Sequence, residues 1–209
     1  MHETWQQLAD HALVPVVVLD DPAAALPLGQ ALVDGGLPVA EVTLRTPEAL
    51  KGIQELAGHG GLLVGAGTVL TPQQVDLAVE AGARYIVSPG LSRAVVERCQ
   101  AIGVPVLPGA VTATEVQAAI ELGLEAVKFF PAATSGGPAA VAALAAPFAD
   151  MRFVPTGGID AGNVGDYLAL PAVLAVGGSW MVPRAAIRAG DFARVRELTS
   201  QAVAATRGR

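Results

Sequence analysis

Short runs of Val, Ile and Leu recur along the chain about every twenty to twenty-five residues. Apolar runs of this length are typical of strands that are buried on both faces, as in parallel sheets. Most of the runs end in Gly, Pro, Ser or Thr, the residues that favour a turn. We therefore expect strands over eight segments: 14–19, 39–44, 62–66, 85–88, 104–107, 126–130, 152–155 and 173–176.

The segments between these runs have helical spacing and recognisable helix starts. Thr71 and Pro72 open one helix, with the proline suited to its first turn. Residues 112–115 read Thr-Ala-Thr-Glu, the pattern of a capping box. Asp160 is a candidate N-cap for a later helix. Residues 3–13 predict a short N-terminal helix that covers one end of the domain.

Eight strands alternating with seven or eight helices predict one α/β domain over residues 1–209, a compact (β/α)₈ barrel with a short N-terminal helix. An open doubly wound sheet is the alternative. It is disfavoured because the first strand is followed by Leu-Asp-Asp-Pro at 19–22, and not by a glycine-rich dinucleotide fingerprint.

Composition narrows the function classes. The chain is 52% hydrophobic and 15% charged, with a mean hydropathy of +0.50, so disorder is not expected. A net charge of −6 without a basic block argues against nucleic acid and anionic membranes as partners. The arginines at 194, 196, 207 and 209 are interpreted as the solvated face and end of a final helix.

The sequence also predicts a cytoplasmic protein. The N-terminus lacks the apolar core of a secretory signal, and the most apolar stretch, 168–182, is interrupted by Pro and Gly and is not expected to cross a membrane. With one cysteine, Cys99, there is no disulfide framework.

Polar side chains gather where a barrel places its chemistry, at the carboxyl ends of the strands. In the second strand, alternation puts Glu41, Thr43 and Arg45 on one face, which we expect to point into the barrel mouth. A buried pair between Glu41 and Arg45 is the purely structural alternative.

Lys128 is one of two lysines against eleven arginines, and it lies in the apolar run Ala-Val-Lys-Phe-Phe at 126–130. Lysine can lose its proton and become a nucleophile, which arginine cannot do. Alternation places Lys128 and Phe130 on the interior face, near Glu41 and Arg45. The alternative is a buried structural ion pair.

Two glycine pairs follow the seventh and eighth strands, in Thr-Gly-Gly at 156–158 and Gly-Gly-Ser at 177–179. Backbone amides after these two strands form the recurring phosphate site of such barrels. Gly-Ala-Gly-Thr at 65–68 offers a further close-approach loop and a hydroxyl.

Other reactive residue types receive structural roles. His2, His11 and His59 do not follow a strand and are not spaced as metal ligands, so no metal is expected and acid–base work falls to a carboxylate. Cys99 is expected to pack within a helix.

Three further side chains lie close to the predicted mouth. Asp20 and Asp21 are within reach of it, but turn or cap roles are favoured. Trp180 is expected to pack beneath the phosphate loop.

Six blocks of the sequence occur in one order and cover nearly the whole chain: Glu-Val-Thr-Leu-Arg-Thr at 41–46, Gly-Ala-Gly-Thr-Val-Leu at 65–70, Ser-Pro-Gly at 88–90, Lys-Phe-Phe-Pro at 128–131, Pro-Thr-Gly-Gly-Ile at 155–159 and Gly-Gly-Ser-Trp at 177–180. Together they resemble the 2-dehydro-3-deoxy-phosphogluconate (KDPG) aldolase family, also called the 4-hydroxy-2-oxoglutarate aldolase family.

The resemblance implies a class I aldolase without metal or cofactor, on a (β/α)₈ barrel, assembled as a homotrimer. It would cleave 2-dehydro-3-deoxy-6-phosphogluconate to pyruvate and glyceraldehyde 3-phosphate. The galactonate-derived phosphate and 4-hydroxy-2-oxoglutarate stay open as alternative substrates. A phosphosugar epimerase or isomerase on the same barrel, and a non-catalytic phosphosugar-binding protein, remain the alternatives.

The resemblance also assigns roles to eleven positions. They are a Schiff-base lysine (Lys128), a proton-transferring glutamate (Glu41), contacts to the pyruvate-derived part (Arg45, Thr68), pocket walls (Pro89, Phe130), a position linked to epimer choice (Thr156) and phosphate loops (Gly157, Gly158, Gly178, Ser179). The chain departs from the family at one place. Family members often read Phe-Pro-Ala-Glu here, whereas residues 130–134 of this chain read Phe-Pro-Ala-Ala-Thr, with Ala133 in place of the glutamate and Thr134 after it.

Overall fold

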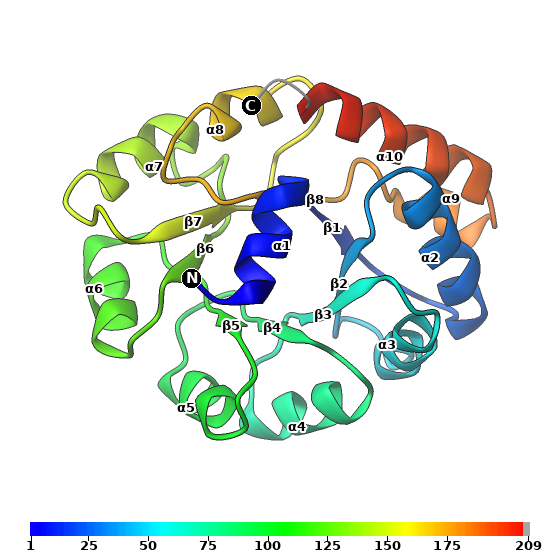
Figure 1. The fold of residues 1–209 in the computed structure, drawn as a ribbon, viewed down its shortest axis with the longest axis horizontal. Helices are drawn as coiled ribbons and strands as arrows, with labels where there is room; N and C mark the ends of the chain where they lie inside the picture. Colours follow the sequence, from blue (N-terminus) through cyan, green and yellow to red (C-terminus); the bar gives the residue numbers. More distant parts are fainter. Residues whose placement is uncertain (207–209) are drawn as a thin grey trace.

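The computed structural model describes residues 1–206 and has an α/β fold, with parallel strands in the middle and helices outside them (Figure 1). The strands are β1 (Leu13–Val17), β2 (Val39–Thr43), β3 (Leu63–Gly67), β4 (Tyr85–Val87), β5 (Val106–Leu107), β6 (Ala126–Phe129), β7 (Arg152–Pro155) and β8 (Val176–Gly178). The helices are α1 (Glu3–His11), η1 (Pro22–Ala24), α2 (Ala25–Asp34), α3 (Ala49–Gly58), α4 (Pro72–Glu80), α5 (Arg93–Ala101), α6 (Ala113–Glu121), α7 (Gly137–Ala145), α8 (Val164–Leu168), α9 (Arg184–Arg188) and α10 (Phe192–Thr206). Arg207 and Arg209 of the predicted final helix lie outside the described residues.

The parallel strands pair in two groups. Six of them form one sheet in the order β5-β4-β3-β2-β1-β8, and β6 pairs with β7 in a second sheet. Isolated parallel bridges, Gly109 to Lys128 and Thr156 to Gly177, connect the two sheets on either side. The predicted alternation of strands and helices is therefore confirmed, with the ladder interrupted beside β6 and β7.

The last strand lies further along the chain than expected. The apolar run predicted a strand over 173–176, whereas β8 is Val176–Gly178. The reason is a change of partner: the Leu174 N–H donates to the Phe153 carbonyl of β7 at 2.8 Å, and the Val176 N–H donates to the Ala12 carbonyl before β1 at 2.8 Å. Apolar periodicity does not reveal such a switch.

Two of the three expected helix starts are confirmed. The Thr71 side chain caps α4, and the reciprocal capping box of Thr112 and Glu115 opens α6. The expectation for Asp160 is wrong, because α8 begins after Asn163. The Asp160 carboxylate instead accepts from the Gly162 N–H at 2.8 Å and closes a local turn.

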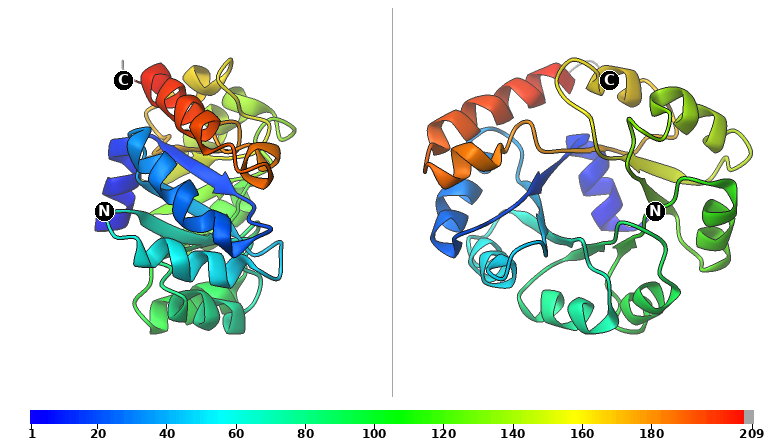
Figure 2. Two further views of the ribbon diagram at one scale, coloured as in Figure 1. Left: turned by 90° about the vertical axis from the view of Figure 1, so that its right-hand side faces the viewer. Right: turned by 180° about the vertical axis from the view of Figure 1, so that it is seen from behind.

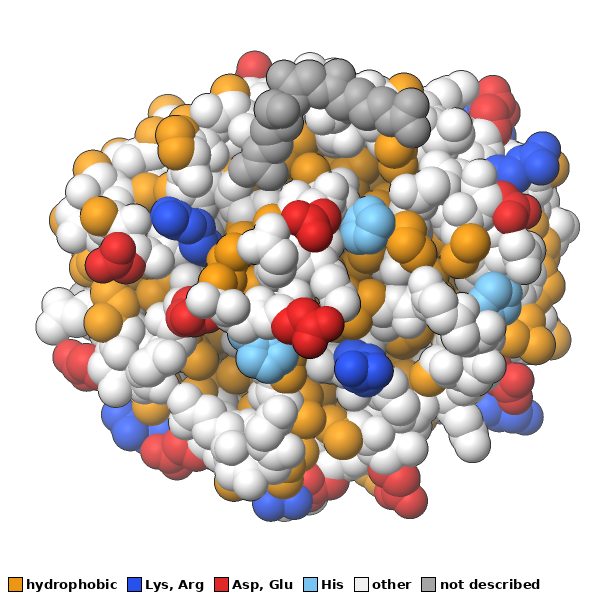
Figure 3. Space-filling model, in the orientation of Figure 1, with side chains coloured by type: hydrophobic (Ala, Val, Ile, Leu, Met, Phe, Trp, Pro, Cys, Tyr) orange, Lys and Arg blue, Asp and Glu red, His pale blue; other side chains and the backbone are white. Residues whose placement is uncertain are grey.

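The predicted N-terminal helix is α1, which covers one end of the strands with Trp5 and Leu8 buried (Figures 1 and 2). In the left view of Figure 2 the arrow of β1 points away from α1, so the carboxyl ends of the strands open on the opposite side. On the α1 face, acidic and basic side chains are interspersed (Figure 3). Within residues 1–206, no helix is long and apolar enough to cross a membrane.

The packing between β3 and β4 depends on Gly65, which has no side chain. The Tyr85 ring occupies the space where a Cβ at Gly65 would lie, 2.2 Å from the ring carbon Cζ. Its hydroxyl donates to the Ala40 carbonyl at 3.2 Å. Burial and then the charge of Glu41 raise the pKa of Tyr85 well above its usual value, so the phenol stays neutral and remains a hydrogen-bond donor.

We expect Gly65→Ala to destabilise the protein by about 2 to 3 kcal/mol, because the added methyl group overlaps a fully buried ring that has nowhere to move. Urea unfolding followed by circular dichroism measures the change. Gly165→Ala is the control, because a Cβ at Gly165 in α8 meets nothing within 4 Å. Equal unfolding midpoints for the two variants would contradict this account of the core.

Candidate active site

A cavity of about 510 Å³ opens at the carboxyl ends of the strands. All eleven residues that the sequence singled out line it: Glu41, Arg45, Thr68, Pro89, Lys128, Phe130, Thr156, Gly157, Gly158, Gly178 and Ser179. They come from six strands or the loops that follow them, so the fold brings together positions that are far apart in the chain. A larger hollow near Met1 and Arg152 lies at the other ends of the strands and contains none of them.

Lys128 and Glu41 form a buried ion pair in this cavity. The Lys128 Nζ donates to the Glu41 Oε1 at 3.0 Å, and the two side chains are 7% and 3% exposed. Both backbones are held by strand pairing, β2 between β1 and β3, and β6 against β7. The ammonium also lies 5.4 Å from the centre of the Phe130 ring, a favourable cation–π position.

The position of the Glu41 carboxylate is set by Gly67 on the neighbouring strand. A Cβ at Gly67 would lie 2.3 Å from the Glu41 Oε1 and 2.8 Å from its Cγ. The side chain therefore fits only because β3 has glycine there. Gly65 makes room for Tyr85 in the same way two residues earlier.

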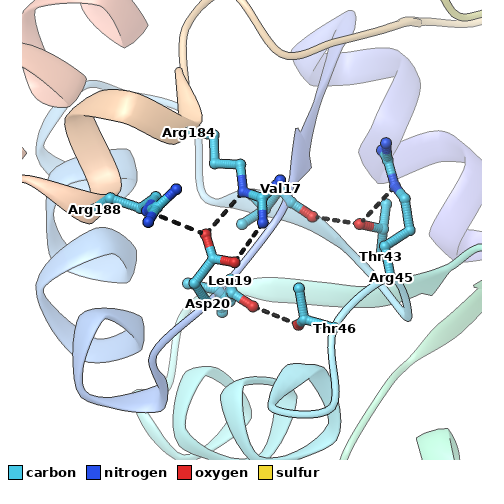
Figure 4. A network of polar contacts seen from close by, with 8 residues as sticks. All are labelled: Val17, Leu19, Asp20, Thr43, Arg45, Thr46, Arg184 and Arg188. Carbon is cyan, nitrogen blue, oxygen red and sulfur yellow. Dashed lines mark hydrogen bonds and ion pairs between the residues drawn. The ribbon is translucent and has the colours of Figure 1, made fainter.

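Arg45 does not pair with Glu41, so the structural alternative for these two residues is wrong. Its Nε donates to the Thr43 Oγ1 at 3.2 Å, and the Thr43 hydroxyl donates to the Val17 carbonyl at 2.9 Å (Figure 4). The Arg45 guanidinium is exposed at the cavity, and the chain of contacts orients it from β1 and β2. Its charge is thus available to an anionic ligand.

The two predicted phosphate loops lie at the same cavity. Gly157 and Gly158 have φ angles of 100° and 72°, and a Cβ at Gly157 would lie 3.3 Å from the Phe130 ring. The Trp180 ring packs against Gly178, as expected, because a Cβ there would overlap it at 1.9 Å. These glycines bring the backbone close to the space that a ligand would fill.

The loop with the unusual sequence after β6 packs on the loop after β7. The N–H groups of Ala132 and Ala133 donate to the carbonyls of Thr156 and Gly157 at 2.8 and 3.0 Å. A Cβ at Gly158 would lie 2.5 Å from the Ala133 Cβ, so these two positions are in close contact. Ala133, where the chain departs from the family pattern, therefore packs against the predicted phosphate loop at Gly158.

Thr68 has a left-handed backbone with a φ of 59°, one of two non-glycine residues with positive φ within residues 1–206. A threonine in this region is strained, and such strain gathers at functional sites. The strained backbone places Thr68 at the cavity wall directly after Gly67.

Sequence reasoning missed Arg184, a charged cavity residue. Its guanidinium binds Asp20 through two contacts, Nε to Oδ2 at 2.8 Å and Nη2 to Oδ1 (Figure 4). The hydrogen bond from Arg184 lowers the pKa of the Asp20 carboxyl, against the opposing effect of burial. The Asp20 carboxylate therefore binds an arginine and caps no helix, whereas Asp21 caps η1 as expected. The one signal was the position of Arg184 five residues after the last glycine–serine loop.

The remaining residues keep structural roles. Cys99 is buried, and burial raises the pKa of its thiol to about 12, so it is protonated at neutral pH and packs within α5. Residues 1–206 contain no group of three His, Cys, Asp or Glu side chains arranged to hold a metal ion.

Residues 5–198 match the family model for KDPG and KHG aldolase. The chain belongs to this aldolase family. It is 48% identical over 190 residues to the 2-dehydro-3-deoxy-phosphogluconate aldolase of Treponema pallidum, covering 90% of each chain.

Two crystal structures of relatives superpose closely on this aldolase-family chain. One is the KDPG aldolase of Legionella pneumophila with pyruvate captured as a covalent carbinolamine, with a TM-score of 0.91, 40% identity and coverage of 95% of this chain and 97% of that one. The other is the 2-keto-3-deoxy-6-phosphogluconate aldolase of Zymomonas mobilis with 3-phosphoglycerate, with a TM-score of 0.91, 42% identity and coverage of 99% and 96%.

The variant Gly67→Ala tests how the glutamate is positioned. Because the new Cβ would overlap the Glu41 carboxylate, we expect the carboxylate to move and its 3.0 Å contact with the Lys128 Nζ to break. A crystal structure of the variant measures this distance, and Gly165→Ala serves as the control. A contact retained at its original length in Gly67→Ala would show that the strand, and not the missing side chain, fixes Glu41.

Proposed function

We propose that this protein is a class I aldolase that cleaves 2-dehydro-3-deoxy-6-phosphogluconate to pyruvate and glyceraldehyde 3-phosphate. The observation that carries the proposal is the buried amine of Lys128 at 3.0 Å from the Glu41 carboxylate, facing a cavity with Arg45 and two glycine loops. A buried ion pair adds little stability, so its place at a cavity favours a chemical role over a structural one. The names of the relatives support the same activity.

In the proposed reaction, Lys128 is the nucleophile. Its proton passes to Glu41, and the neutral amine adds to the C2 ketone of the substrate to give a carbinolamine. Glu41 then returns a proton to the departing hydroxyl, water leaves, and a protonated imine links C2 to the Nζ. The 3.0 Å contact supports this step because it provides a direct path for the proton.

Cleavage follows because the protonated imine accepts electrons. A base takes the proton of the C4 hydroxyl, the C3–C4 bond breaks, and the bonding electrons move to C3 as an enamine while C4 becomes the aldehyde of glyceraldehyde 3-phosphate. Glu41, now ionised again, is the base, directly or through one water. The enamine is reprotonated at C3, and water hydrolyses the imine to release pyruvate and the free lysine.

The other cavity residues would bind the substrate. Arg45 would hold the carboxylate beside the ketone through charge-assisted hydrogen bonds, and Thr68 would contact the same part. Phe130 and Pro89 would form the walls beside the imine, with Thr156 near the hydroxyl that distinguishes epimers. The amides of Gly157, Gly158, Gly178 and Ser179 would bind the phosphate.

The phosphosugar epimerase or isomerase and the non-catalytic phosphosugar-binding protein are less favoured. Neither alternative requires an amine in contact with a carboxylate inside the cavity, and the family model names an aldolase. The family name also supports 4-hydroxy-2-oxoglutarate as a second substrate.

Four broader inferences complete the proposal. We infer that the two sheets form one (β/α)₈ barrel, supported by the bridges at Gly109 and Thr156 that connect them. The single domain over residues 1–209, the homotrimer and the cytoplasmic location remain predictions from the sequence and its resemblance.

Covalent trapping tests the nucleophile. Incubation with pyruvate and borohydride should reduce the imine and leave one pyruvate-derived adduct on the peptide that contains Lys128, detected by mass spectrometry. Lys51, the other lysine of the chain, is exposed and serves as an internal control that should stay unmodified. An absent adduct on Lys128, or a metal requirement for activity, would contradict the proposal and favour the epimerase.

Glu41→Gln tests the proton shuttle while keeping the shape of the side chain. We expect kcat to fall about 10²- to 10⁴-fold, the range for loss of a general acid–base, while the Lys128 adduct with pyruvate still forms, more slowly. Steady-state kinetics and the trapping experiment measure the two effects. Normal turnover in this variant would remove Glu41 from the mechanism.

A further inference from the structure

Arg184 is a cavity residue that the proposed reaction has not used. It begins α9, directly after Val182 and Pro183, and lines the cavity together with Gly178 and Ser179. Its side chain is 54% exposed, so its charge is accessible from the cavity and from solvent.

The side chains that line the cavity carry more positive than negative charges. Its lining has three cationic side chains, Arg45, Lys128 and Arg184, and one carboxylate, Glu41. Lys128 and Glu41 pair with each other, and the proposed function assigns Arg45 to the substrate carboxylate. The glycine loops offer amides but no formal charge, whereas a phosphate monoester carries close to two negative charges at neutral pH. Arg184 is the cation left for it.

Asp20 holds the Arg184 guanidinium in a fixed orientation. The bidentate contact uses Nε and Nη2 and joins the loop after β1 to the start of α9 (Figure 4). A guanidinium has five N–H donors, so the donors on Nη1 are not used by this pair. The Arg188 Nε lies 3.9 Å from the Asp20 Oδ2, so it partly offsets the carboxylate charge from the side of a neighbouring hollow.

We propose that Arg184, oriented by Asp20, is a specificity-determining residue that binds the distal phosphate of the substrate and selects phosphorylated substrates over 4-hydroxy-2-oxoglutarate. This inference rests on the proposed aldolase function. The five-carbon substrate has no phosphate, and its second carboxylate lies next to the bond that breaks. It therefore has no phosphate for a cation beside the loop after β8 to bind.

The variant Arg184→Gln separates the two substrates. We expect its KM for 2-dehydro-3-deoxy-6-phosphogluconate to rise about tenfold, as for loss of one charge-assisted hydrogen bond at an exposed site, with a smaller change in kcat. The preference for this substrate over 4-hydroxy-2-oxoglutarate, as the ratio of kcat/KM values, should fall by the same factor. Arg184→Lys should restore part of the preference, because it keeps the charge without the fork.

Binding of inorganic phosphate gives a readout that does not need turnover. Its dissociation constant, from calorimetry or from competitive inhibition, should rise about tenfold in Arg184→Gln and about threefold in Asp20→Asn, where the arginine keeps its charge but loses its orientation. Arg194→Gln is the matched control. Arg194 forms a surface ion pair with Glu197 in α10, does not line the cavity, and should leave all of these values within about twofold of the wild type.

Equal losses for both substrates in Arg184→Gln, or an unchanged phosphate affinity, would overturn the inference and leave Arg184 as a structural partner of Asp20. Thermal unfolding of each variant identifies a general loss of folding, and in that event Arg184→Lys decides the question. The aldolase proposal is tested separately by the pyruvate adduct on Lys128. If the wild-type protein forms the adduct and Arg184→Gln keeps its phosphate affinity, the proposed role of Arg184 is refuted and the aldolase proposal stands.

Discussion

The contact between the Lys128 amine and the Glu41 carboxylate joins two strands that are 87 residues apart in the chain. Each charge would be costly to bury alone, and together they are tolerated because strand pairing holds both backbones and the geometry is that of a good hydrogen bond. The rest of the site is arranged around this pair. Gly67 on β3 makes room for it, the Phe130 ring packs near its amine, and Arg45 is oriented by Thr43.

Much of the fold followed from the sequence because its signals are local. Near-continuous apolar runs predicted the strands, and the Thr112–Glu115 pattern predicted a helix start that the structure confirms. The misplaced β8 and the failed cap at Asp160 have a common reason. The backbone before β8 is bound by partners distant in the chain, and Asp160 closes a local turn. The apolar pattern contains no information about either kind of hydrogen bond.

The residues of the site were predicted more accurately than the ends of the strands and helices. The reason is that alternation along a strand determines which side chains face the interior. Glu41 and Lys128 lie at the cavity for that reason, whereas Arg45 lies two residues beyond the end of β2 and is oriented by its hydrogen bond to Thr43. Arg184 was missed because it follows a loop instead of lying on a strand, and its partner Asp20 is 164 residues away. Periodicity along a strand gives no information about a contact between the loop after β1 and the start of α9. Their meeting depends on β8 pairing with β1, which only the assembled sheet reveals.

The two glycines of β3 have a consequence for how this sequence can vary. Gly65 and Gly67 alternate along the strand, so the inner face of β3 is occupied by the side chains of its neighbours, Tyr85 from one side and Glu41 from the other. The space left by the two missing side chains is filled by Tyr85 and Glu41, so the two glycines determine where these side chains lie. An exchange at Gly65 or Gly67 would therefore require a matching loss of volume on β4 or β2. Val64 and Ala66 on the outer face are themselves buried, so exchanges there must conserve volume.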